Sequence, residues 1–177
     1  MATREAHRGL VIVNTGHGKG KTTAALGVMT RAWGRDWKVC VLQWIKATTS
    51  NYGEHRAARK MGIDLISMGA GFTWLSKDVE KDVDLAQQCW DEAKRRILSG
   101  EYDLVILDEI TYPINYGWLD LDDILETLRQ RPHYVHVICT GRDADQRLVE
   151  HADLVTDMQE VKHPYKQGIR AQAGIEF

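Results

Sequence analysis

The chain has 177 residues, 44% of them hydrophobic, which is enough to bury a substantial core without disulfides or metals to staple it. Its 23 basic and 25 acidic residues leave a formal net charge of −2, so no general attraction to nucleic acid or to an acidic membrane is expected. The 3 cysteines are widely spaced, as expected for buried thiols in a reducing compartment. The polar start, residues 1–8, and the lack of an apolar run of about 18 residues favour a cytoplasmic protein without a membrane partner.

Short apolar runs alternate with helical patterns along the whole chain. Six runs rich in Val, Ile and Leu have the pattern of strands buried on both faces of a parallel sheet. The expected strands are Gly9–Thr15, Lys38–Trp44, Ile63–Met68, Asp103–Glu109, Tyr134–Thr140 and Asp153–Met158. With right-handed crossovers, this order predicts an α/β three-layer sandwich around a mostly parallel six-stranded sheet. We expect one domain over residues 1–177, with 1–8 as a short arm and 161–177 as a tail.

Four helices are expected between these strands. One runs from about Thr22 to Trp33, and another over Leu121–Gln130, capped by Asp120 and stopped by Pro132. The strongest pattern has apolar residues at spacings of four and three and ends at Gly100. Its expected buried face consists of Val79, Val83, Ala86, Trp90, Ala93 and Ile97. Asp143 followed by Gln146 has the form of a capping box that opens a short helix toward His151.

The run from Val11 to Thr23 carries the strongest functional signal, because an apolar strand leads into a loop of glycines, lysines and threonines. Glycine lets successive backbone N–H groups approach one anion, and a following helix adds its N-terminal dipole. The spacing is one residue tighter than that of the usual triphosphate loop when it is counted from Gly16. We interpret the loop as a triphosphate site in a P-loop nucleotide-binding fold of RecA-like type; the alternative is a turn that binds nothing. The expected binding residues are Thr15, Gly16, His17, Gly18, Lys19, Gly20, Lys21, Thr22 and Thr23.

Two adjacent acids end the fourth expected strand, at Asp108 and Glu109. Carboxylates beside a phosphate loop suit Mg²⁺, to which the Thr22 hydroxyl would also bind. Side chains alternate along a strand, so the two acids point the same way only if the strand stops between them. One acid should therefore bind the metal and the other support it. Solvated loop acids are the alternative interpretation.

Other polar and aromatic residues follow neighbouring strands. Arg142 lies on the same sheet edge as the phosphate loop and is suited to bind a phosphate in a bidentate manner, or else it is simply exposed. Phe72 and Trp74 lie in a glycine-flanked loop on that edge. From the residues alone they plug the core or form an apolar wall for a large flat ligand. The histidines have no metal-ligand spacing and are expected to be surface or partly buried residues.

These motifs together resemble the ATP:corrinoid adenosyltransferases of bacterial cobalamin synthesis and salvage. The family loop T-G-x-G-K-G-K-T-T-A-A is matched by Thr15–Ala25, with His17 where Asn is common. G-F-T-W is matched by Gly71–Trp74, and L-D-E-[LI]-T-Y by Leu107–Tyr112. T-G-R is matched by Thr140–Arg142, and the family tail by Val161–Ile175. The resemblance covers almost the whole chain from about Arg8 onward.

The resemblance implies transfer of the 5′-deoxyadenosyl group of ATP to cobalt(I) of a corrinoid such as cobalamin or cobinamide, with release of triphosphate. It implies that ATP binds in the reverse sense, with C5′ toward the corrinoid. Lys21 would stabilise the departing charge, and Mg²⁺, or Mn²⁺ in its place, would be held by Thr22 and Glu109 with Asp108 in support. Phe72 and Trp74 would displace the lower axial ligand of the corrinoid, which eases reduction of cobalt(II).

The resemblance also implies a flavoprotein reductant and a homodimer. Family members often carry a longer basic N-terminal extension over the site, whereas about eight residues precede the first expected strand here. Closure of the site is then expected from a partner subunit or from the tail. Two other functions remain open from the residues: a small P-loop kinase or ATPase, which usually has an arginine-rich lid, and a non-catalytic nucleotide sensor.

Overall fold

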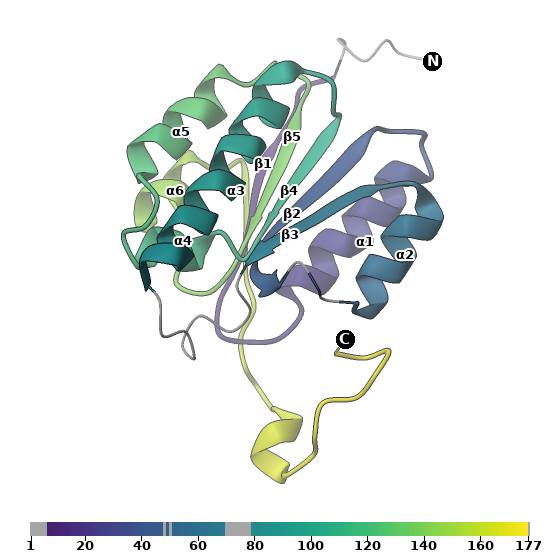
Figure 1. The fold of residues 1–177 in the computed structure, drawn as a ribbon. Helices are drawn as coiled ribbons and strands as arrows, with labels where there is room; N and C mark the ends of the chain where they lie inside the picture. Colours follow the sequence, from purple (N-terminus) through teal and green to yellow (C-terminus); the bar gives the residue numbers. More distant parts are fainter. Residues whose placement is uncertain (1–6, 48, 50, 70–78, 177) are drawn as a thin grey trace.

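The structure is a computed structural model that describes residues 7–47, 49, 51–69 and 79–176. Six strands form one sheet in the order β3-β2-β4-β5-β1-β6 (Figure 1), and every pairing is parallel. The strands are β1 (Val11–Thr15), β2 (Val39–Ala47), β3 (Asp64–Gly69), β4 (Leu104–Asp108), β5 (His136–Thr140) and β6 (Leu154–Asp157). All six expected strands are confirmed, with small shifts at their ends.

Helices cover both faces of this sheet (Figure 1). One face carries α1 (Lys21–Trp33) and α2 (Gly53–Met61); the other carries α3 (Val79–Ser99), α5 (Leu121–Gln130) and α6 (Gln146–His151). Because side chains alternate along a strand, Val41 packs in the core below α1 and α2, while Leu42 packs in the core below α3 and α5. The expected three-layer α/β sandwich is therefore confirmed.

The expectation of strands buried on both faces is wrong for the edges of the sheet. All four residues of β6 are exposed, and β3 is only partly buried along most of its length. Within the described part of the chain each of these strands has a neighbouring strand on one side only, so the helical layers cover it less completely. The expected face of α3 also fails at its start, where Val79 is exposed and Asp82 is buried instead.

The expected helices are present, but one cap is wrong. Asp120 caps α5 by accepting from the Asp122 N–H, and Gly100 follows α3 with φ +65°, both as expected. The cap of α6 is Asp145, whose side chain accepts from the Arg147 N–H. Asp143 has φ +52° and lies before the helix, so the expected capping box does not form.

Three short elements were not expected from the sequence: α2, α4 (Thr111–Asn115) and the 3₁₀ helix η3 (Pro164–Gln167). Helix α2 has few apolar residues, and its buried positions are only His55 and Ala58, so it lacks a hydrophobic stripe. After α6 the chain forms β6 and then extends, up to residue 176, past the carboxyl ends of the strands (Figure 1).

The 3 cysteines are free and buried, as expected, and burial raises the pKa of Cys40 and of Cys139 to about 12. None of the helices in the described ranges combines the length and apolar content that crossing a bilayer requires.

Candidate nucleotide site

The phosphate loop occupies residues 16–20, between the end of β1 and the start of α1. Gly16 and Gly20 have φ of +95° and +112°, which only glycine adopts readily. A Cβ on Gly18 would lie 2.6 Å from the carbonyl oxygen of Met158, just after β6. The Gly18 N–H donates to that same oxygen at 2.6 Å. The loop therefore needs glycine for its close contact with the chain after β6 as well as for its backbone conformation.

Lys21 lies over this loop. Its Nζ donates to the carbonyl oxygens of Gly16 and Gly18 at 2.7 and 2.6 Å. Burial, and next the positive charge of Arg142, lowers the pKa of Lys21. Gly20 is the N-cap of α1 and supplies no side-chain cap, so the first N–H groups of the helix remain available to an anion. The loop, the ammonium and the helix end thus combine as an anion site.

Several expected binding residues direct their side chains to other partners. The Thr15 hydroxyl accepts from the Ala144 N–H at 3.1 Å. His17 Nε2 lies 3.1 Å from Asp143 Oδ1, and Lys19 Nζ lies 2.7 Å from Glu176 Oε2. Thr23 is exposed on α1. A role of Thr15, His17 and Lys19 toward a phosphate would therefore come from their backbone.

The Asp108 carboxylate is fully buried and is surrounded by donors. Its Oδ1 accepts from the hydroxyls of Thr22 and Thr140 at 2.7 and 2.8 Å. Its Oδ2 accepts from Gln43 Nε2 at 2.9 Å and lies 3.5 Å from Lys46 Nζ. Thr22, on the first turn of α1, is thereby joined to the end of β4.

Glu109 has different surroundings from its neighbour. Strand β4 ends at Asp108, and Glu109 has φ +66°, so the chain turns between the two acids. Its N–H donates to Thr140 Oγ1 at 2.9 Å, while its carboxylate accepts no hydrogen bond from the described residues. Burial, and next the charge of Asp108, raises the pKa of Glu109 to about 7. Of the two acids, Glu109 has the free oxygens.

The donor set fits a magnesium ion. Thr22, Asp108 and Glu109 offer only hard oxygen atoms, which Mg²⁺ prefers, and Mg²⁺ usually takes one or two carboxylates together with substrate phosphates and water. Within the ranges that the structure describes, no group of three or more His, Cys, Asp or Glu residues could hold a metal alone. Such an ion would therefore depend on the nucleotide for part of its coordination.

Three polar residues near Asp108 were missed from the sequence: Gln43, Lys46 and Glu54. Lys46 Nζ lies 2.6 Å from Glu54 Oε1. Burial opposes the Lys46 charge, yet Asp108 and Glu54 raise its pKa above the ordinary value. The available signal was a glutamine and a lysine inside the otherwise apolar run of β2.

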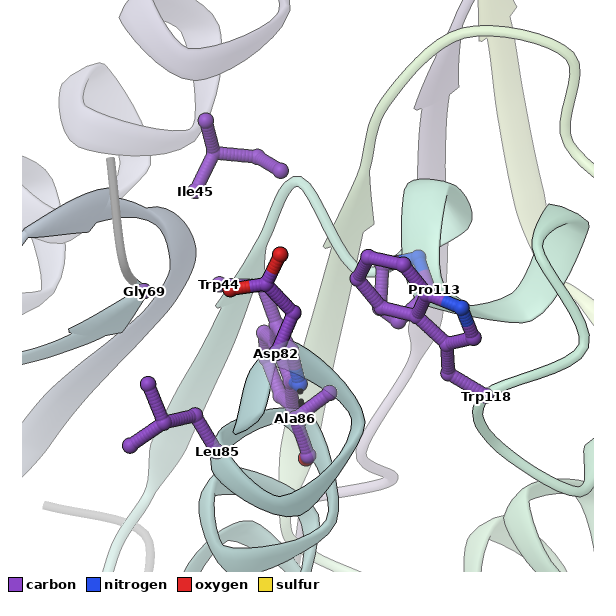
Figure 2. Close-up of a pocket in the computed structure, with 8 residues that line it drawn as sticks. All are labelled: Trp44, Ile45, Gly69, Asp82, Leu85, Ala86, Pro113 and Trp118. Atoms are coloured by element: carbon purple, nitrogen blue, oxygen red, sulfur yellow. Dashed lines mark hydrogen bonds between the residues drawn. The ribbon is translucent and has the colours of Figure 1, made fainter. Parts of the chain in front are cut away.

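The remaining candidates are less defined. Arg142 follows β5 and is exposed, close enough to Lys21 for its charge to act on that ammonium. Phe72 and Trp74 lie outside the described residues. Figure 2 shows the residues that line a small hollow beside Gly69, among them Trp44, Asp82 and Trp118. Its volume of about 10 Å³ suits one water molecule, not a nucleotide.

Two solved structures are similar to this chain in fold. The flagellar accessory protein FlaH from Methanocaldococcus jannaschii matches with a TM-score of 0.58 at 14% identity, covering 85% of this chain and 71% of that one. The RadB recombinase matches with a TM-score of 0.51 at 15% identity, covering 89% and 77%. At these identities the likeness concerns the fold alone, and it agrees with the expected RecA-like arrangement.

Sequence comparison is more specific. A corrinoid adenosyltransferase of Escherichia coli K12 is 41% identical over 177 residues, covering 100% of this chain and 90% of that protein. One from a Sinorhizobium species is 40% identical, covering 100% and 84%. The corrinoid adenosyltransferase CobA of Salmonella typhimurium is 38% identical, covering 100% and 90%. The model of the family "ATP:corrinoid adenosyltransferase BtuR/CobO/CobP" matches residues 7–177. The chain therefore belongs to the ATP:corrinoid adenosyltransferases, the enzymes that transfer the adenosyl group of ATP to a corrinoid.

Proposed function

We propose that the transfer takes place at the carboxyl edge of the sheet, over the phosphate loop and the end of β4. Cobalt(I) of the corrinoid attacks C5′ of ATP; its electron pair forms the Co–C5′ bond, and the pair of the broken C5′–O bond leaves with triphosphate. The observation that carries this site is the 2.7 Å hydrogen bond from Thr22 to Asp108, which joins the phosphate-binding helix to the acidic strand end.

The loop residues have separate roles in this proposal. Gly16 to Thr22 hold the triphosphate, with C5′ directed toward the corrinoid. Lys21 exchanges its carbonyl partners for phosphate oxygens and stabilises the charge that develops on the leaving group, helped by Arg142. Thr22 and Glu109 bind Mg²⁺ or Mn²⁺, and Asp108 supports Thr22. When bound, the ion neutralises charge on the triphosphate.

Lys21→Ala should lower kcat about a hundredfold while the protein stays folded, because losing one donor to a developing anion costs about 3 kcal/mol. Lys38→Ala is the matched control, since Lys38 pairs with Glu101 at the opposite edge of the sheet. The measurement is adenosylcobalamin formation from chemically reduced cobalamin, with intact triphosphate as the second product. Near wild-type turnover of a folded Lys21→Ala protein, or ADP and phosphate as products, would contradict the proposal.

We propose further that Phe72 and Trp74 face the corrinoid and expel its lower axial ligand, so that a flavoprotein can reduce cobalt(II). The support is the match of Gly71–Trp74 to the aromatic motif of the family to which the chain belongs. If instead these residues plugged the core, truncation to Ala would cost about 3–5 kcal/mol of unfolding free energy.

The test compares two sources of electrons in Phe72→Ala and Trp74→Ala. Activity with a flavoprotein reductant should fall strongly, activity with cobalt(I) made by a strong chemical reductant should fall much less, and the melting temperature should hardly change. Equal losses with both reductants, or a large drop in melting temperature, would return the two aromatics to the core.

The oligomeric state and the cellular location are also proposals. We infer a homodimer, because β6 is an exposed edge strand in which Leu154 and Val155 are 49% and 37% exposed. A cytoplasmic location is supported by the three buried free thiols, which are typical of reducing compartments.

A further inference from the structure

A chain of hydrogen bonds runs from α2 across two strands to Asp108. The Tyr52 N–H donates to His55 Nδ1 at 3.2 Å, and His55 Nε2 lies 2.8 Å from Ser67 Oγ. Ser67 Oγ donates to Gln43 Oε1 at 2.8 Å, and Gln43 Nε2 donates to Asp108 Oδ2 at 2.9 Å. His55 is buried at 6% exposure, and Gln43 and Asp108 are both at 0%.

The sheet register explains why these residues meet. Gln43 on β2 lies level with Ser67 on β3 and with Asp108 on β4. All three side chains point to the face covered by α1 and α2, where His55 and Thr22 are found. Helix α2 is thus linked to the acidic strand end by side chains on this face of the sheet.

Each hydrogen bond in this series is donated in the direction of Asp108. His55 Nδ1 accepts a backbone N–H, so Nε2 carries the proton and donates to Ser67. The Ser67 hydroxyl is then directed at Gln43 Oε1. With Oε1 engaged, the amide of Gln43 presents its NH₂ group to Asp108 rather than its carbonyl oxygen. A reversed amide would set two acceptors against each other in a buried position.

The orientation of Asp108 in turn sets that of Thr22. Because Asp108 Oδ1 accepts the Thr22 proton, the lone pairs of the Thr22 oxygen are left for another partner. Such buried hydrogen bonds around a metal-binding side chain fix its rotamer and strengthen its binding to the metal. A disturbance at Ser67 or His55 is therefore transmitted through Gln43 and Asp108 to Thr22.

We propose that Ser67 and His55 are positioning residues for the magnesium site: they hold the Gln43 amide with its NH₂ group on Asp108, and so hold Thr22 ready to bind the ion. This role rests on the proposed function, in which Thr22 and Glu109 bind Mg²⁺ together with ATP. In this role Ser67 and His55 act on the ion through Gln43, Asp108 and Thr22 and do not bind it themselves.

The test measures Mn²⁺ binding by electron paramagnetic resonance, with Mn²⁺ as the probe and ATP present, and no corrinoid. Ser67→Ala and His55→Leu should weaken Mn²⁺ binding about threefold to tenfold, at or below the low end of the effects seen when a metal ligand loses a supporting partner. Ser67→Thr and His55→Gln should restore binding, since Thr keeps the hydroxyl and Gln can accept from Tyr52 and donate to Ser67. Ser99→Ala is the control, because the Ser99 hydroxyl donates to the Arg96 carbonyl oxygen and accepts from the Glu101 N–H at the C-terminal end of α3.

The possible results distinguish the hydrogen-bond relay, which runs from His55 through Ser67 and Gln43 to Asp108, from the metal site that it supports. Wild-type affinity in Ser67→Ala and His55→Leu overturns the relay and leaves the metal site intact. Weak binding that Ser67→Thr and His55→Gln fail to restore also overturns it, because lost packing then explains the effect. Failure of the wild-type protein to bind Mn²⁺ with ATP refutes the proposed metal site, and the relay with it.

Discussion

Asp108 and Glu109 show how much the surroundings of adjacent acids can differ. Asp108 is at 0% exposure, and hydroxyl, amide and ammonium groups meet its two oxygens. Glu109 is turned off the strand by its left-handed backbone and keeps its oxygens free of such donors among the described residues. An incoming ion can therefore bind Glu109 without breaking an existing hydrogen bond, whereas direct binding to Asp108 would displace one.

Glu109→Gln should weaken the Mg²⁺ dependence of the reaction more than Asp108→Asn does. Asp108→Asn should instead lower the melting temperature more, because its new NH₂ group would face donors in a buried place. The measurements are activity against Mg²⁺ concentration and thermal unfolding of the metal-free proteins. The opposite ranking in the Mg²⁺ titration would make Asp108 the direct ligand.

At this scale, the sequence predicts residues whose neighbours are local. Side-chain alternation predicts that Asp108 and Glu109 differ in role, and the glycines and lysines of residues 16–21 predict the phosphate loop. The turn itself was not predicted, because the expected strand ran through Glu109 whereas β4 ends at Asp108. The partners Gln43, Lys46 and Ser67 could not be predicted, because they reach Asp108 only through the register of three parallel strands far apart in sequence. Apolar patterning places such strands in a sheet but does not align them.

At the scale of elements, long and strongly apolar segments are predictable, and short polar ones are not. The central strands are buried on both faces and so appear in the sequence as continuous apolar runs, and α3 shows a helical period of apolar residues. Helix α2 does not, because its 9 residues bury only His55 and Ala58 and are held by a cap and by the ion pair of Glu54 with Lys46. The cap of α6 was misplaced because two aspartates, at 143 and 145, offer the same chemistry to the same helix start.

The exposure of edge strand β6 favours its pairing with a second copy of the chain. Among the strands that the structure describes, β6 pairs only with β1, and exposed edges with apolar side chains tend to pair with another chain. Leu154→Lys should convert the proposed homodimer to a monomer by placing a charge in the interface. Val79→Lys is the matched control, because Val79 is 59% exposed at the start of α3, away from β6. Sedimentation velocity measures both variants; a dimer that survives Leu154→Lys would exclude this edge as the interface.

For the whole molecule, buried or half-buried histidines and the half-buried Glu109 change the stability with pH in opposite directions. Burial lowers the pKa of His55, His136 and His151 below the ordinary value of 6.5. The unfolded chain then binds more protons than the folded one as pH falls through that value, so these residues reduce stability at lower pH. Glu109, with its pKa raised from 4.5 to about 7, binds its proton more tightly when folded, and so reduces stability as pH rises between those values.

The two effects should be separable by one substitution. In metal-free buffer, Glu109→Gln removes the acid, so its unfolding free energy should rise more steeply than that of the wild type between about pH 5 and pH 7. Adding His136→Gln should reduce that slope, because it removes a half-buried histidine that accepts the Leu10 N–H and whose pKa is lowered in the folded protein, so that the unfolded chain binds its proton more readily. Glu126→Gln, at an exposed acid paired with Arg129, is the control and should run parallel to the wild type in this window. Urea unfolding at several pH values measures the slopes. If the slope for Glu109→Gln equals that of the wild type, the Glu109 carboxyl has the same pKa in the folded protein as in the unfolded chain. The positive charges of Lys46 and Lys21 would then offset the effects of burial and of the Asp108 charge on that pKa.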